Sequence, residues 1–292
     1  MRFFIPIDKP RYAGRVSLLR LRSPVMFAAL LLTLALATWV VTVQRMRGMD
    51  AGPGTDLGGL GWYLGIWVTM MAAMMLPSVA PMVLVFHRIS LERARRSEPF
   101  VRTWVFTLSY FAVWALYGLA AYLLYRLVVH LDLGWLAWHR GGRFLAGGAI
   151  AAAGLYELTP LKSVCLRHCR SPLHFVMHGW RDGVRGAWRM GAVHGGYCVG
   201  CCWGLMLVLF ALGVMSLVWM AAVAGLIFVQ KILPSGERLT RVFAVLFVAA
   251  GVWVASSPGS VPGLTQPTHM QMGDLNQMQQ SKPPMTTTPM MP

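Results

Sequence analysis

The soft metal-ligating side chains of this chain are concentrated in one short region. All five cysteines of the 292 residues lie between residues 157 and 203. Cys165 and Cys169 form a Cys-x3-Cys pair. Cys198 ends a His-x3-Cys pair that begins at His194, and Cys201 and Cys202 are adjacent. Thiolate and imidazole groups bind Cu(I) or Zn(II), because soft and borderline ions accept sulfur and nitrogen donors. The region is therefore a candidate site for a soft metal ion.

The segment around His194 reads AVHGGYCVGCCWGLM and predicts a helix with two distinct faces. At roughly 100° per residue, the imidazole and the three thiols share a sector about 100° wide. A separate stripe consists of glycines, and its members are Gly196, Gly200 and Gly204. Small residues at this spacing let another membrane helix approach closely. We expect the glycines to pack the helix while the ligands point into a bundle.

Each of these side chains also has a purely structural explanation. A free cysteine packs as a small hydrophobic residue, and a single histidine can hydrogen-bond across a helix bundle. The four groups on one face are better explained together as a site, because an ionisable histidine at membrane depth requires a partner.

The Cys165 and Cys169 pair lies in the stretch YELTPLKSVCLRHCRSPLHF. Pro160 should end the preceding helix, which places Glu157 in its last turn. The two thiols then lie just inside the membrane on the reducing side, where they remain free to bind metal, and His168 offers an optional nitrogen ligand. Neighbouring Arg and Lys side chains would favour thiolates, but they are equally explained as anchors for lipid headgroups.

Methionines add a second type of soft ligand in the motif MMAAMMLPSVAPM. Two pairs are spaced by four residues on a helix, and they are Met70 with Met74 and Met71 with Met75. Thioethers favour Cu(I), so this ligand type makes Cu(I) the preferred ion over Zn(II). Pro77 and Pro81 would open the helix backbone beside the pairs. Methionine is also an adaptable packing residue, which remains the alternative explanation.

These candidate ligands must be positioned by membrane-spanning helices. Hydrophobic residues make up 57% of the chain and charged residues 12%. The apolar runs are long enough to cross about 30 Å of hydrocarbon. We predict an all-α, polytopic bundle of about seven transmembrane helices, over residues 24–43, 60–86, 101–128, 144–159, 192–212, 214–233 and 239–256.

The distribution of charge predicts the orientation of this bundle. With the N-terminus inside, most of the 26 Lys and Arg residues fall in inside segments, as expected for a multi-pass protein of the inner (cytoplasmic) membrane. The C-terminus is then outside. Anionic membrane lipids also explain the net charge of +16, so no nucleic-acid partner is needed.

The predicted organisation has three parts. A basic cytoplasmic segment covers residues 1–23, the bundle covers 24–256 with an inside loop at 161–190 that forms one or two short interfacial helices, and an outer tail covers 257–292. The tail is rich in Met, Pro and Gln, so we expect it to be disordered. Its thioethers would suit the capture of Cu(I), and a low-complexity tail without a ligand role explains the composition equally well. The first apolar run could instead be a signal peptide cleaved after Ala35-Leu36-Ala37, but its length favours an uncleaved helix.

The motifs at Tyr156–Pro172, His194–Met206 and Met70–Met82 together resemble an uncharacterised bacterial family of predicted metal-binding integral membrane proteins. The resemblance covers roughly Leu60–Ser256 and implies a multi-helix membrane protein with a metal site. Carried onto this chain, it selects the five cysteines, His194 and the two methionine pairs. The family commonly has Gln at the position of Glu157, which suggests a variable hydrogen-bonding position there and not a metal ligand.

Two functions from different classes follow from these residues. The first is metal handling at the membrane, with Cu(I) passed to or from a donor or acceptor protein. The second is a thiol oxidoreductase that uses the Cys198, Cys201 and Cys202 cluster, although a single C-x-x-C is a weak indication and no thioredoxin-like strand pattern is present. A structural membrane subunit is a third explanation. The sequence shows no nucleotide-binding glycine loop, and its few acidic residues make a paired-carboxylate site hard to place, so other enzymatic activities are not favoured.

Overall fold

The computed structural model describes residues 24–47, 57–96, 102–131, 141–212, 216–233 and 236–257, and within these ranges it contains helices and no strand. The helices are α1 (Pro24–Met46), α2 (Leu60–Arg95), α3 (Thr103–His130), α4 (Arg143–Glu157), α5 (Pro160–Arg170), α6 (Pro172–Gly179), α7 (Gly183–Leu212), α8 (Leu217–Ile232) and α9 (Gly236–Ser256). The all-α prediction is confirmed for this part of the chain. The predictions for residues 1–23 and for the tail beyond residue 257 lie outside the described residues.

Each of the seven predicted spans corresponds to a helix, and two short helices occupy the predicted inside loop. Five described helices are long and apolar enough to cross a membrane: α1, α2, α3, α7 and α9. Helix α4 has 15 residues and α8 has 16, so each is short for a span. Helices α4 and α5 meet at an angle of 66° and could together form one broken span. A membrane protein of several spans is thus supported, while the number seven stays a prediction.

The break between α4 and α5 has a local cause in the sequence. Helix α4 ends at Glu157, as predicted, and Pro160 occupies the first turn of α5. Pro lacks a backbone N–H and is tolerated in a first turn, where that donor would have no helical partner. Thr159 caps α5, because its hydroxyl accepts a hydrogen bond from the backbone N–H of Lys162 at 3.3 Å. Two helices therefore replace one straight helix at this point.

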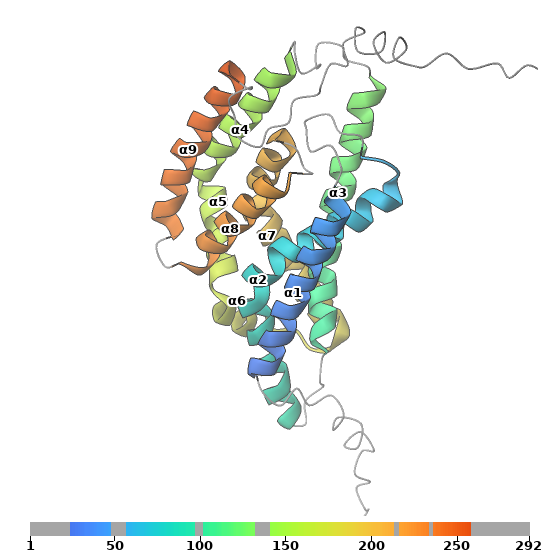
Figure 1. Cartoon of the computed structure of the whole chain (residues 1–292). Helices are drawn as coiled ribbons and strands as arrows, with labels where there is room; N and C mark the ends of the chain where they lie inside the picture. Colours follow the sequence, from blue (N-terminus) through green and yellow to red (C-terminus); the bar gives the residue numbers. More distant parts are fainter. Residues whose placement is uncertain are drawn as a thin grey trace, which may run out of the picture.

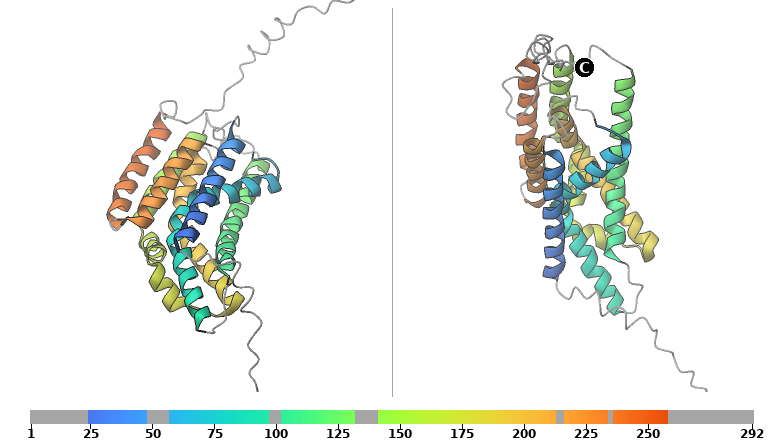
Figure 2. Two further views of the ribbon diagram at one scale, coloured as in Figure 1. Left: turned by 60° about the horizontal axis from the view of Figure 1, so that its bottom comes forward. Right: turned by 45° about the vertical axis from the view of Figure 1, so that its right-hand side comes forward.

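Helix α7 forms the centre of the bundle. It packs against α3, α4, α5 and α8, while α1 lies along α2 and α9 lies along α4. Figure 1 shows α4 and α9 side by side at one edge of the molecule and α3 at the other, and Figure 2 shows the same grouping from two further directions. Helix α2 runs for 36 residues and continues through both of its prolines.

Glycines set how closely the helices approach α7. A Cβ on Gly200 would lie 2.7 Å from the sulfur of Cys165, and one on Gly204 would lie 3.3 Å from the ring of Tyr156, so these two members of the predicted stripe do face neighbouring helices. Gly196 has no such neighbour within 4 Å, so the prediction that it packs against another helix was wrong. The tightest approach on this helix, to α3, is made instead by Gly191.

The outward faces of several helices are apolar. Leu36 on α1, Leu116 on α3 and Val245 on α9 are 66%, 65% and 70% exposed. Water-soluble proteins rarely expose large contiguous apolar surfaces of this kind. These faces are suited to contact with lipid.

Candidate metal centre

Three thiols on α7 converge in the interior of the bundle. The sulfur atoms of Cys198, Cys201 and Cys202 all lie within 4.8 Å of one another, and each residue is at most 2% exposed. The Sγ atoms of Cys201 and Cys202 are 3.3 Å apart. Positions i, i+3 and i+4 of a helix share one face, which is why the spacing in the sequence brings these thiols together. The predicted thiol face is present.

A fourth thiol reaches this cluster from α5. The Sγ of Cys169 lies 3.8 Å from the Sγ of Cys201. Because the break at Pro160 turns α5 away from the direction of α4, its end can face α7. Sequence analysis placed Cys169 in a separate cluster, and the structure joins it to the α7 cysteines. We refer to Cys169, Cys198, Cys201 and Cys202 as the thiol cluster.

Hydrogen-bonding groups from two other helices, α3 and α8, contact the sulfur of Cys198. Lys231 of α8 donates from Nζ to the sulfur over 3.0 Å, and the hydroxyl of Tyr110 on α3 lies 3.1 Å from it. Lys231 also donates to the hydroxyl of Ser78 on α2 over 3.4 Å. Lys231 is 6% exposed. The charge of a protonated lysine stabilises a neighbouring thiolate, which is the form that binds metals.

His194 lies on the same helix as the three thiols, four residues before Cys198, and is 2% exposed. Its ring is packed among the rings of Phe106, Tyr110 and Phe175, with centroid distances of 6.1, 5.7 and 5.4 Å. Its Nδ1 atom is buried and has no hydrogen-bond partner. Buried polar atoms are usually paired, so an unpartnered imidazole nitrogen needs an explanation. A free nitrogen of this kind can act as a ligand, but His194 does not belong to the group that the three α7 thiols form within 4.8 Å of one another.

Two other predicted ligands have different surroundings. The sulfur of Cys165 packs against the backbone of α7 at Gly200. The ring of His168 stacks on Tyr197 with centroids 4.2 Å apart, and its Nδ1 lies 2.9 Å from the carbonyl oxygen of Val164. Both side chains therefore have packing roles beside the thiol cluster.

The four predicted methionine ligands are all buried in α2. Met70, Met71, Met74 and Met75 are each at most 1% exposed. They belong to the same hydrophobic core as the α7 cysteines. One turn after Met74, Ser78 of α2 accepts a hydrogen bond from Lys231, which also contacts Cys198.

A second buried polar group lies between α8 and the α4–α5 break. Lys162 donates to Glu157 Oε1 over 2.6 Å and to Gln230 Oε1 over 3.1 Å. Gln230 in turn donates to Glu157 Oε2 over 2.9 Å. Glu157 is thus held by hydrogen bonds, in agreement with the expectation of a hydrogen-bonding position there.

Lys162 and Lys231 were not recognised as interior residues in the sequence. The charge distribution predicts that both lie in inside segments near the membrane surface, yet they are 1% and 6% exposed. The dipeptide Gln230-Lys231 was the available indication, because two more apolar residues follow it, Ile232 at the end of the helix and Leu233 at its C-cap.

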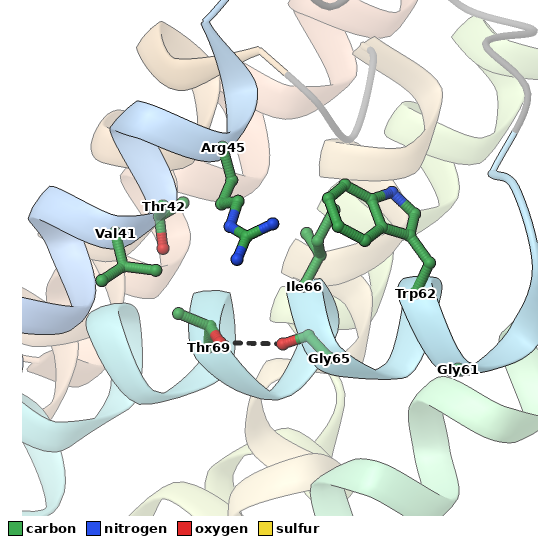
Figure 3. A pocket seen from close by; sticks show the side chains of 8 residues that line it. All are labelled: Val41, Thr42, Arg45, Gly61, Trp62, Gly65, Ile66 and Thr69. Carbon is green, nitrogen blue, oxygen red and sulfur yellow. Dashed lines mark hydrogen bonds between the residues drawn. The ribbon is translucent and has the colours of Figure 1, made fainter.

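A surface cavity of about 250 Å³ lies elsewhere, between α1 and α2. Arg45 extends over the ring of Trp62 at 5.2 Å from its centroid, and Thr69 bonds back to its own helix at Gly65 (Figure 3). None of the thiols lines this cavity.

Comparison with known protein families identifies the family to which this chain belongs. A family model described as PpoB2, copper chaperone, matches residues 64–254, which is more than half of the chain. The chain belongs to the PpoB2 copper-chaperone family. No curated protein and no solved structure matches it.

The matched region of this PpoB2 family member contains the candidate ligands that lie on the described helices. It includes the thiol cluster, Cys165, His168, His194 and the four methionines of α2. Copper handling is therefore indicated both by the family and by a buried cluster of cysteines. The predicted resemblance to a metal-binding family is confirmed in that the matched family is copper-related.

Proposed function

We propose that this protein binds Cu(I) in the thiol cluster, within a membrane, and transfers it to a partner protein. The observation that carries the proposal is a buried group of thiols in a member of a copper-chaperone family. Three sulfur atoms of α7 lie within 4.8 Å of one another, and a fourth, from Cys169 on α5, lies 3.8 Å from that of Cys201. Thiolates select Cu(I) among the biological metals because both are soft. The ion is cargo here, so the site must bind it tightly and still release it.

His194 and the methionines have secondary roles in this proposal. The unpartnered nitrogen of His194 is available as a further ligand at the helix turn that precedes Cys198. The methionines of α2 would act as transient ligands, because neutral thioethers bind Cu(I) more weakly than thiolates. Cys165 and His168 line the surroundings of the site through their packing on Gly200 and Tyr197.

The membrane location rests on the long apolar helices and on their apolar outward faces. We propose the inner membrane, with seven spans, the N-terminus inside and the C-terminus outside. Under this arrangement α5 lies on the reducing side, where its thiols remain reduced. A protein partner that supplies or receives copper would complete the transfer.

The proposal is tested by measuring Cu(I) binding to the full chain, purified in detergent without oxygen. A colorimetric Cu(I) chelator at known concentration reports the affinity by competition. We expect tight binding to the wild-type protein and at least about a tenfold loss of affinity in Cys198→Ser and Cys201→Ser, equivalent to 1.4 kcal/mol or more. Cys165→Ser is the matched control, because it also removes a buried thiol but one that packs on Gly200. Equal affinity in all four proteins would refute the site.

A second function is favoured by a short sulfur–sulfur distance. The Sγ of Cys201 lies 3.8 Å from the Sγ of Cys169 on another helix, so a disulfide between these two residues would need only a small movement. Oxidation of two thiols would release two electrons and two protons to a partner disulfide or a quinone. A reversible disulfide in protein that binds no copper would support this oxidoreductase function over copper handling.

A further inference from the structure

Lys231 is the least expected charged residue beside the thiol cluster. Its ammonium group is buried, and its described partners are the sulfur of Cys198 at 3.0 Å and the hydroxyl of Ser78 at 3.4 Å. A buried charge is costly unless it is paired, and an ionisable residue inside a membrane bundle is retained for a function. Lys231 therefore needs an anionic partner nearby.

Glu157, the buried carboxylate among the described residues, already has hydrogen-bonding partners. Glu157 is bound by Lys162 over 2.6 Å and by Gln230 over 2.9 Å. Among the described residues, no ion pair joins Lys231 to a carboxylate. The negative charge available to Lys231 is therefore that of the thiol cluster, in its thiolate or metal-bound form.

We propose that Lys231 is a fixed counter-cation that makes the thiol cluster prefer a monovalent metal ion over a divalent one; this inference rests on the proposed copper function. For a given set of thiolates, the ammonium repels a divalent ion twice as strongly as a monovalent ion at the same position. The repulsion is strong in a buried site, where the effective dielectric constant is low. Lys231 thereby disfavours Zn(II), although thiolates alone would bind it well.

The positive charge of Lys231 also stabilises the site when Cu(I) is bound. Cu(I) bound by two thiolates carries one net negative charge, and an uncompensated charge of this kind is costly in a membrane interior. Lys231 neutralises it through its position beside Cys198. Tyr110 adds a second hydrogen-bonding group to the same sulfur without changing the charge.

The test compares Cu(I) and Zn(II) affinities of the full chain under anaerobic conditions, with a chelator for each ion. The reported quantity is the ratio of the two dissociation constants. We expect Lys231→Met to shift this ratio toward Zn(II) by about tenfold or more, since one buried unit charge is removed. Lys231→Arg, which keeps the charge, should stay within about threefold of the wild-type ratio. Ser78→Ala removes the other partner of Lys231 and should also leave the ratio unchanged.

The outcomes separate this inference from the function on which it rests. If Lys231→Met weakens both ions equally, or if Lys231→Arg shifts the ratio as much as Lys231→Met, the counter-cation role is overturned while copper binding stands. If the wild-type protein binds neither ion, the proposed function itself fails. Should Lys231→Met not fold, Lys231→Gln carries the same comparison, because it also removes the charge but keeps a hydrogen-bond donor.

Discussion

Lys162 Nζ lies 2.6 Å from Glu157 Oε1 across the break between α4 and α5, and both side chains are 1% exposed. The pair connects the end of one helix to the first turn of the next. Gln230 closes the group from α8. Since Lys231 follows Gln230 directly, the same turn of α8 contacts both the ion pair and the thiol cluster. One turn of α8 therefore joins the helix break to the metal site.

Removing one member of this ion pair should strongly destabilise the protein. We expect Lys162→Met to lower the free energy of unfolding by about 3–5 kcal/mol, because it leaves the carboxylate of Glu157 buried without a cation. The double variant Lys162→Met with Glu157→Gln should cost less than the single change. Unfolding midpoints in detergent micelles measure both effects.

An exposed pair supplies the control for this comparison. Arg95 lies 3.7 Å from Glu92, and their side chains are 79% and 54% exposed. Arg95→Ala should change stability by less than about 1 kcal/mol, because solvent screens the interaction. A similar loss in Lys162→Met and Arg95→Ala would show that the buried pair contributes no more than a surface pair.

The contact between α3 and α7 should depend on Gly191. A Cβ at this position would lie 2.0 Å from the hydroxyl of Ser109 and 2.1 Å from the carbonyl oxygen of Phe106. Gly191→Ala therefore forces backbone movement, and we expect a loss of about 1–3 kcal/mol or more. Gly196→Ala, on the same helix with no neighbour within 4 Å, should be neutral or slightly stabilising. Thermal unfolding of the two variants tests the difference, and equal midpoints would contradict it.

Much of this architecture could be predicted from sequence because it depends on local rules. Apolar run length indicated the helices, Pro160 indicated the break, and helical periodicity placed Cys198, Cys201 and Cys202 on one face. Each of these properties is decided by residues within a few turns of one another.

The features that could not be predicted depend on packing between helices. Lys162 and Lys231 lie near helix ends, where the usual expectation is a charge that faces lipid headgroups. Their burial depends on partners 68 and 33 residues away, Gln230 and Cys198. Likewise, helical periodicity identified glycines on α7 but not Gly191 as the one that α3 would contact.

The methionines of α2 should affect the rate of copper loading more than the affinity. Thioethers are weak ligands beside thiolates, and Met74 and Met75 lie one turn before Ser78, which contacts Lys231. Leu is close in volume, so the double variant Met74→Leu with Met75→Leu should keep the fold. We expect slower loading in rapid-mixing experiments, with the equilibrium affinity within about threefold of wild type. Unchanged loading would assign these residues to packing alone.

The orientation in the membrane should follow the distribution of Arg and Lys. With the N-terminus inside and seven spans, a reporter fused after the last residue lies on the outer side. We expect alkaline phosphatase to be active and green fluorescent protein to be dark at this position, because the former requires an oxidising compartment. Fusions in the loop between α2 and α3 should show the opposite result. Matching signals at both positions would contradict the predicted topology.

Cys169 provides the sharpest test of a site shared between two helices. Its sulfur lies 3.8 Å from Cys201 although the two residues come from α5 and α7. We expect Cys169→Ser to weaken Cu(I) binding by about tenfold or more, since a hydroxyl is a poor ligand for a soft ion. Cys165→Ser changes a thiol on the same helix, one turn earlier, and should keep the wild-type affinity because Cys165 packs on Gly200. Chelator competition measures both variants. A loss confined to Cys165→Ser would make Cys165, and not Cys169, the α5 ligand and require a different ligand set.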